Sequence, residues 1–278
     1  MKINQQTYCR RNVLRVLAIA TSVGLAGCTA SDNDESATKS NDSLEFTSRI
    51  EETQLVLRFQ AGVIDQVNVV DPAGELFATR TVEAGVSRLA VEIGTEYTPG
   101  TYDVIGLAAD EVVETHSLKL EPNLELIDLR LGKNHPEEMY EGANELDIAA
   151  KAILYLTNTG SASTAVTSLR FRGDVPLPTH ESYDETGDCG IYDTDNKVGG
   201  NADEVVIPAG ETIVIYSNTR PFSPTARGAE CNLAGYEGRF TVELSSVHAS
   251  QDIKLEYTIQ YQDTKPRGCA YEIERVPS

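Results

Sequence analysis

Apolar and polar residues alternate in short segments between residues 44 and 122. In the segment 87–93, Leu89, Val91 and Ile93 alternate with Arg88 and Glu92. A period of two residues is typical of an antiparallel strand with one buried face and one face in water. We expect such strands at 54–60, 66–70, 76–82, 87–93, 101–108 and 112–120. The segments 71–74 (DPAG) and 98–100 (TPG) are typical of tight turns, because Pro fixes φ and Gly accepts a positive φ.

The second half of the chain repeats this pattern with longer polar loops. Alternation predicts strands at 124–131, 148–156, 239–244 and 254–261, each with one face on a core and the other in water. In the second of these, Lys151, Ile153 and Tyr155 belong to the face expected in water. Pro122 ends the last extended run of the first half. We therefore expect one β-sandwich over residues 45–122 and a larger one over 123–278.

Four short motifs resemble those of immunoglobulin-like domains. Segments 69–75 (VVDPAGE) and 99–104 (PGTYDV) are similar to the hairpin motifs of immunoglobulin-like modules in surface proteins. Segments 155–160 (YLTNTG) and 207–212 (IPAGET) resemble adhesion-type or CARDB-like immunoglobulin-like domains, apart from the long polar insertion between them. The expected fold class is all-β, with two tandem immunoglobulin-like β-sandwich domains after a cleaved signal and a disordered tether. Such a scaffold does not fix a function.

The first 28 residues have the organisation of an export signal. Arg10 and Arg11 precede an uncharged run, 16–27, which is too short to span a bilayer comfortably. Segment 9–15 (CRRNVLR) resembles a twin-arginine signal. Segment 25–28 (LAGC) resembles a bacterial or archaeal lipobox, in which Cys28 takes a diacylglyceryl group and becomes the new N-terminus. The alternative is cleavage by an ordinary signal peptidase, with Cys28 incidental.

This leader predicts a protein held at the outer face of the cell membrane by a lipid. Residues 29–44 are polar and acidic and are expected to form a disordered tether. No later segment approaches 18 consecutive apolar residues, so we expect an anchored protein rather than a spanning one. The membrane is therefore one expected partner, through the lipid on Cys28.

Acidic residues dominate the expected mature chain. The 278 residues include 23 Lys and Arg and 43 Asp and Glu, and the first 28 residues hold four of the basic residues and no acidic one. A negatively charged surface repels nucleic acid, so nucleic acid is excluded as a partner. The acids are spread along the chain rather than gathered in one tail, which favours adaptation to high salt. Together with the leader, this composition resembles a haloarchaeal secreted lipoprotein.

Three cysteines remain after the leader: Cys189, Cys231 and Cys269. An odd number outside the cell suggests one disulfide and one further thiol, and spacing does not select the pair. A structural zinc site would need a fourth ligand and closer spacing.

The acidic segment 180–204 is the strongest candidate for a metal site. Asp193, Asp195, Asn201 and Glu204 occupy positions 1, 3, 9 and 12 of a calcium loop that starts at Asp193. Lys197 stands at a ligand position, and an EF-hand would need flanking helices. The alternatives are a looser calcium loop and a solvated acidic loop with no ion. No other cofactor is expected.

Signatures of catalysis are absent from the sequence. The four His show no H-E-x-x-H spacing, and there is no G-x-S-x-G elbow or phosphate-binding Gly-rich loop. The chain has no Trp, which argues against a sugar-stacking cleft. Two carboxylates that meet only in space would leave no signature in the sequence.

Phe222 could anchor a partner, although such a Phe more often folds back over the end of a sandwich.

The sequence therefore favours a lipid-anchored, non-catalytic extracellular protein that binds or interacts in a high-salt environment. The loops of the second domain, 173–204 and 218–237, are expected to face a surface protein or another envelope component. Two alternatives remain open. One is a structural envelope spacer, in one version stiffened by calcium, and the other is an exported hydrolase that uses dispersed carboxylates.

Overall fold

The computed structural model describes residues 46–180, 183, 189–192, 194, 202, 204–224, 234–263 and 269–277, with only the backbone of Asp263 and Cys269. The predicted signal and tether lie outside these residues, as do Arg10, Arg11 and Cys28. The described part is almost entirely β, and its strands form four sheets. The predicted all-β fold class is therefore confirmed.

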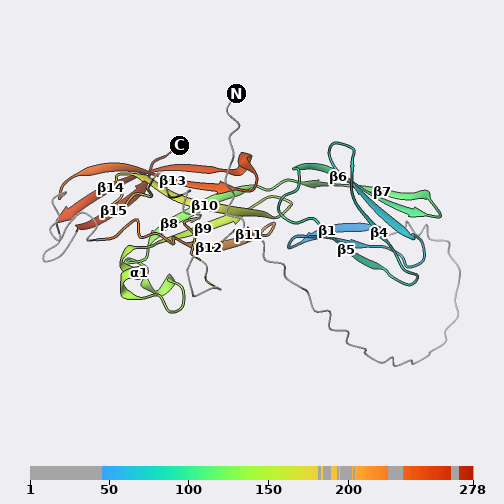
Figure 1. Cartoon of the computed structure of the whole chain (residues 1–278), viewed down its shortest axis with the longest axis horizontal. Coiled ribbons are helices and arrows are strands. Elements are labelled where there is room, and N and C mark those ends of the chain that lie inside the picture. The colour runs from blue at the N-terminus through green and yellow to red at the C-terminus, as the bar shows by residue number, and fades with distance from the viewer. Residues whose placement is uncertain are drawn as a thin grey trace, which may run out of the picture.

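The first sandwich contains a three-stranded sheet, β1-β2-β5, and a four-stranded sheet, β4-β3-β6-β7 (Figure 1). Its strands are β1 (Thr47–Glu51), β2 (Gln54–Arg58), β3 (Gln66–Val70), β4 (Leu76–Thr81), β5 (Arg88–Glu92), β6 (Gly100–Ala108) and β7 (Glu111–Leu120). Six of the seven agree with the predicted segments to within two residues at each end. Strand β1 was not predicted, because it has few apolar residues.

The predicted turn at 71–74 forms, and it contacts the predicted turn segment 98–100, where the chain bends at Pro99 and β6 begins at Gly100. Asp71 accepts hydrogen bonds from the backbone N–H groups of Ala73 and Glu75, at 2.9 Å each. The hydroxyl of Tyr102, buried at the start of β6, donates to the carbonyl oxygen of Thr98 (3.0 Å). This bond back across the corner is the tyrosine corner of immunoglobulin-like sandwiches. A Cβ at Gly100, whose φ is +152°, would lie 2.7 Å from Cγ of Pro72, so this residue must be Gly.

The second sandwich contains a three-stranded sheet, β12-β9-β8, and a five-stranded sheet, β11-β10-β13-β14-β15. Its strands are β8 (Leu124–Leu131), β9 (Ala152–Asn158), β10 (Thr164–Gly173), β11 (Val205–Ile207), β12 (Thr212–Tyr216), β13 (Glu237–Ser246), β14 (Ile253–Asp263) and β15 (Cys269–Arg275). Side chains of both sheets form one hydrophobic core. The predicted strand 124–131 is confirmed at both ends.

Phe222 lies in this core and does not face a partner. It is 1% exposed, and its ring is stacked on Tyr271 and in edge contact with Phe171 and Phe240, with centroids 5.7 to 5.8 Å apart. Its backbone N–H donates to the carbonyl oxygen of Ala150 (3.0 Å). The expectation that this side chain folds back over the end of the sandwich is confirmed.

The predicted strand 148–156 is wrong over its first part. Residues Glu145–Ala150 form helix α1, because Asn144 caps it by accepting hydrogen bonds from the backbone N–H groups of Leu146 (2.9 Å) and Asp147 (3.0 Å). Strand β9 begins only at Ala152.

The prediction that Lys151, Ile153 and Tyr155 face water is also wrong in part, since Lys151 is 3% and Ile153 0% exposed. The segment 132–150, between β8 and β9, covers this face of the sheet.

The two sandwiches lie end to end, with turns from each in contact (Figure 1). The hydroxyl of Tyr97 donates to the carbonyl oxygen of Ser163 (2.9 Å), and the Ser161 hydroxyl donates to that of Lys119 (2.7 Å). Ser163 Oγ also donates to the carbonyl oxygen of Glu52. The expected boundary at Pro122 falls in the short connection between β7 and β8.

Candidate functional site

The far end of the second sandwich gathers three long loops. Strands β8 and β12 both pair with β9 in antiparallel fashion, so they run in the same direction. Strand β10 also starts at the junction with the first sandwich, where Ser163, the residue before it, donates to the carbonyl oxygen of Glu52. All three point away from the first sandwich. The segments that follow them therefore meet at the end where α1 lies (Figure 1).

These loops enclose an open cleft of about 700 Å³. Its main lining residues come from the segment after β8 (Tyr140, Asp147 and Lys151), the loop after β10 (Leu177 and Tyr192) and the loop after β12 (Asn218, Thr219 and Arg220). Clefts of about 300 to 1,000 Å³ are typical sites for small ligands. The predicted loops 173–204 and 218–237 both contribute described residues to it, whereas the contribution of 132–151 was not predicted.

The floor of the cleft is a buried Lys–Asp–Tyr cluster. Side chains of Lys151 and Asp147 are 4% and 10% exposed, and Lys151 Nζ lies 3.8 Å from Asp147 Oδ1. Tyr140 Oη donates to Asp147 Oδ2 (2.7 Å) and accepts from Lys151 Nζ (3.1 Å). One turn of helix separates Asp147 from Lys151, which places both side chains on the same side of α1. The cluster thus joins the helix to the start of β9.

Arg220 connects the loop after β12 to this cluster. Its Nε and one terminal nitrogen lie 3.0 Å from Asp147 Oδ1. Burial alone would raise the pKa of Asp147, but hydrogen bonds from Tyr140 and Arg220, with the charge of Lys151, hold it below its ordinary value. Burial lowers the pKa of Lys151, and the charge of Asp147 opposes that effect. A carboxyl group acting as a general acid would need the opposite shift.

Two tyrosines form an aromatic wall beside the cations. The rings of Tyr140 and Tyr192 are stacked with centroids 4.1 Å apart, and Tyr216 meets Tyr140 edge-on. Lys151 Nζ lies 3.9 Å from the Tyr192 centroid and 5.0 Å from that of Tyr140. An ammonium group this close to two ring faces gains cation–π attraction.

Glu138 fixes the segment 132–150 to the outer face of the sheet. Its carboxylate accepts hydrogen bonds from Arg130 (2.6 Å) and the hydroxyl of Tyr155 (2.9 Å), and its carbonyl oxygen accepts from the hydroxyl of Tyr216 (2.9 Å). Arg130, Ile153 and Tyr216 are register partners across β8, β9 and β12 and so share one face. The covering segment explains why Ile153 is buried.

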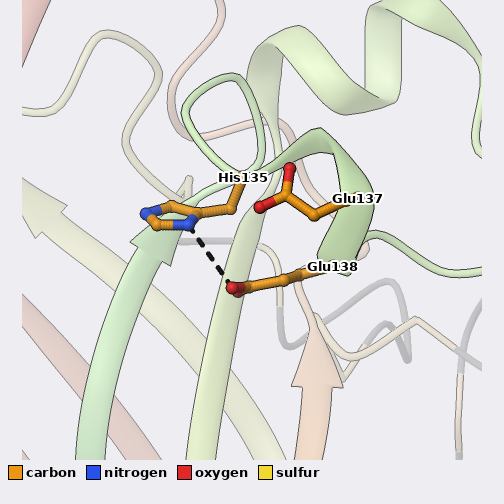
Figure 2. Close-up of side chains that lie close together, drawn as sticks. All are labelled: His135, Glu137 and Glu138. Carbon is orange, nitrogen blue, oxygen red and sulfur yellow. Dashed lines mark ion pairs between the residues drawn. The ribbon is translucent and has the colours of Figure 1, made fainter.

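Three side chains of the segment 132–150 are of types that can ligate a metal ion. His135, Glu137 and Glu138 bring their ligand atoms within 4.8 Å of one another, and His135 Nδ1 lies 3.4 Å from Glu138 Oε1 (Figure 2). The guanidinium of Arg130 already pairs with that carboxylate oxygen at 2.6 Å. Because the guanidinium would repel a metal ion there, we assign Glu138 a structural role.

Three of the four predicted calcium ligands, Asp193, Asp195 and Asn201, lie outside the described residues. The fourth, Glu204, is exposed just before β11. The calcium loop therefore stays a prediction.

Of the three cysteines, Cys189 is buried at 1% exposure and its carbonyl oxygen accepts from the backbone N–H of Leu169 (2.8 Å). Cys231 and the side chain of Cys269 lie outside the described residues.

Comparison with known proteins adds no family. No protein-family model matches the chain, and no curated protein does. A β-glucuronidase of glycoside hydrolase family 2 is similar over 81% of this chain and 20% of its own length, at 13% identity and a TM-score of 0.28. A segment of two fibronectin type-III domains from chicken tenascin is similar over 84% of this chain and 98% of its own length, at 9% identity and a TM-score of 0.24. The chain spans about a fifth of the hydrolase. Similarities this weak support no functional conclusion.

One further observation concerns the membrane. In the part of the chain that the structure describes, no helix has the length and apolar character needed to cross a bilayer.

Proposed function

We propose that this chain is a lipid-anchored, non-catalytic extracellular surface protein that binds a partner through the far end of its second sandwich. The observation that carries the proposal is the cleft that the loops after β8, β10 and β12 enclose around the buried side chains of Lys151 and Asp147. A buried ion pair costs desolvation energy, so its position at a cleft rather than inside the core favours a functional use.

The direction of the chain supports this assignment. Glu52, just after β1, accepts a hydrogen bond from Ser163 at the junction, so Thr47 at the start of β1 lies toward the opposite end of the first sandwich. A tether that joins there and ends in a lipid on Cys28 leaves the cleft at the end remote from the membrane. The two sandwiches in line then present the cleft to the surroundings.

A bulky side chain placed in the cleft tests the binding role. Leu177 lines the cleft and is 48% exposed, so Leu177→Trp narrows the cleft without opening the core. Leu76→Trp is the matched control, because Leu76 is an exposed leucine of the first sandwich. The probe is envelope polysaccharide and envelope protein from the source cells, added to vesicles that carry the full-length lipoprotein. Retention lost in Leu177→Trp and kept in Leu76→Trp supports the proposal, and equal retention in both overturns it.

The proposed location has its own test. Arg10→Lys with Arg11→Lys should keep the precursor inside the cell, since the arginine pair is the proposed export signal. Cys28→Ala should release the protein from the membrane fraction. Mass spectrometry of the mature N-terminus distinguishes lipidated Cys28 from a terminus produced by ordinary cleavage.

Two further parts of the proposal concern the cysteines and the acidic surface of the exported protein. We propose that Cys189 forms a disulfide with Cys231 or Cys269, an arrangement that its full burial supports. We also propose that the acidic surface adapts the protein to high salt, which the excess of Asp and Glu supports.

A structural envelope spacer is the second candidate, because one observation favours it. The junction hydrogen bonds of Tyr97, Ser161 and Ser163 oppose bending between the two sandwiches. A stiff rod would serve a spacer and would equally hold a binding site away from the membrane. Unchanged retention in Leu177→Trp, combined with an altered envelope spacing in cells without the protein, would favour the spacer.

A further inference from the structure

Two cations line the cleft of an acidic protein. The chain has a formal net charge of −20, yet the inner part of the cleft holds two cations, Lys151 and Arg220, against one carboxylate, Asp147. Glu141 also lines the cleft but is exposed at its edge. Asp147 already accepts hydrogen bonds from Tyr140, Asn144 and Arg220. The three clustered groups therefore carry one positive charge in excess, which Glu141, the other described carboxylate of the lining, balances only from an exposed position.

Lys151 has unused hydrogen-bonding capacity. Its ammonium group carries three N–H donors. Within the described residues it donates to Tyr140 Oη at 3.1 Å, while its distance of 3.8 Å to Asp147 Oδ1 is an ion pair beyond hydrogen-bond range. Its side chain is only 4% exposed, so water compensates little of the remaining demand, and an oxyanion reaches it only after the side chains around it shift. An oxyanion that enters in this way would supply both the missing acceptor and the missing charge.

Tyr192 brings an aromatic ring to the cleft. Lys151 Nζ is within 5.0 Å of both ring centroids, which are themselves 4.1 Å apart. A position over the far face of Tyr192 would be much farther from Tyr140, so Nζ does not lie over that face. Among the described residues, neither Tyr140 nor Lys151 therefore covers the far face of Tyr192, and Tyr192 lines the cleft. A flat or chair-shaped ring with C–H groups can stack on such a face.

Thr219 adds a hydroxyl at the cleft. Its Oγ1 is buried, and no hydrogen-bond partner reaches it among the described residues. Rotation about χ1 toward a ligand would break no existing hydrogen bond of that atom. The cleft thus combines cations, a tyrosine face and a hydroxyl, which are the groups needed to recognise an acidic ring with several hydroxyls.

We infer, on the basis of the proposed function, that the ligand of the cleft is an acidic saccharide. Its carboxylate pairs with Lys151 and Arg220, and its pyranose ring stacks on Tyr192. This specificity differs from a general attraction of anions, because it requires the charge and the ring in one molecule. The absence of Trp leaves tyrosine as the stacking residue.

Three small probes separate these requirements. Galacturonate carries the ring and the carboxylate, galactose carries the ring alone, and acetate carries the carboxylate alone. Binding to the full-length protein is measured by ligand-observed NMR at two salt concentrations, because contact pairs survive screening better than long-range attraction. Galacturonate is expected to bind at least about tenfold more tightly than galactose or acetate, the factor expected for one charge-assisted contact.

Two variants assign the effect to the cleft. Arg220→Gln removes a partly exposed charge, and Arg239→Gln on β13 is its matched control, since Arg239 is an exposed arginine paired with Glu256. Arg220→Gln and Tyr192→Leu should each weaken galacturonate binding about tenfold, and Arg239→Gln should leave it unchanged. Equal effects of Arg220→Gln and Arg239→Gln would overturn the assignment.

The result also separates this inference from the proposed function. Equal binding of galactose and galacturonate overturns the anionic specificity, and equal binding of acetate overturns the ring. If no probe binds while Leu177→Trp still abolishes retention of an envelope fraction, the acidic-saccharide inference is wrong and the binding role stands. If Leu177→Trp has no effect on retention, the binding role itself fails.

Discussion

Tyr97 of the first sandwich and His248 of the second face each other across the junction, with ring centroids 4.8 Å apart. The hydroxyl of Tyr97 also donates a hydrogen bond to the carbonyl oxygen of Ser163 (2.9 Å). Tyr97 is 4% and His248 8% exposed. The pair therefore closes a dry contact between the turns of two sandwiches, and the orientation of one sandwich depends on a side chain of the other.

Replacing Tyr97 by Phe should loosen this junction. The variant keeps the ring but leaves the carbonyl oxygen of Ser163 without its donor, which costs about 1 to 3 kcal/mol when the acceptor stays buried. Calorimetry should show a lower melting temperature, and small-angle scattering a broader distribution of lengths. Tyr236→Phe is the control, because Tyr236 is 46% exposed. Identical scattering of the variant and the native protein would contradict a role of Tyr97 in stiffness.

His248 should make the same junction sensitive to acid. Burial lowers the pKa of His248 below its ordinary value, and a hydrogen bond with the backbone of Thr95 only partly opposes this. The unfolded chain therefore binds a proton at a higher pH than the folded chain, and stability falls as the pH drops below about 6.5. Its Nε2 is buried with no hydrogen-bond partner among the described residues, so protonation there would leave a buried, unpartnered N–H.

The test is a comparison of acid profiles. His248→Gln should lose stability less steeply than the native protein between pH 7 and pH 5, as measured by thermal melts. Exposed His180 provides the control His180→Gln, which should keep the native profile. Parallel profiles for all three proteins would show that carboxylates alone cause the acid sensitivity.

The positions of most strands could be predicted because a period of two residues is a local property of the sequence. The prediction failed at 148–150, where Ile148 and Ala150 continue the alternation of β9 but belong to α1. The signal that could have corrected it is Asn144, an N-cap residue followed three positions later by Asp147. The burial of Ile153 could not be predicted, because the segment that covers it is polar.

The cleft could not be predicted for a different reason. Lys151, Tyr192 and Arg220 come from three separate loops, and only the shared direction of β8, β10 and β12 brings those loops together. In the sequence, each of these residues is of a type that is common on the surface of β proteins. The sequence did identify two of the three loops as the face of interest, since their length and polarity exceed what a simple connection needs.

Lys133 should make the second sandwich more stable in mild alkali. Its Nζ lies 3.4 Å from the centroid of the Tyr271 ring and donates to the carbonyl oxygen of the same residue (3.2 Å). Burial lowers the pKa of Lys133 to about 8, and the charge of Glu272 opposes this only in part. The folded protein therefore releases this proton before the unfolded chain does, and stability rises as the pH increases from about 8 toward 10.5.

The Lys133→Met variant should lack this rise. Between pH 7.5 and 9.5 the native protein should gain roughly 1 kcal/mol relative to the variant, after allowance for solvent screening of a partly exposed group. Urea unfolding at three pH values measures the difference. Lys254→Met, at a side chain that is 73% exposed, should follow the native profile. A gain that persists in Lys133→Met would assign the pH dependence to another group.

Calcium should raise the melting temperature if the acidic loop is a metal site. A ligand that binds only the folded state at 100 times its Kd adds about 2.7 kcal/mol, and a chelator should reverse the shift. The combined change Asp193→Asn, Asp195→Asn and Glu204→Gln should abolish it, because those carboxylates are the proposed oxygen donors. Asp110→Asn with Glu111→Gln and Glu114→Gln removes the same number of charges from the first sandwich, and Asn is tolerated at the positive φ of residue 110. A shift that survives the loop variant and disappears in the control would place the ion elsewhere. No shift in millimolar calcium would leave the loop as part of a salt-adapted surface and remove the calcium-stiffened form of the spacer.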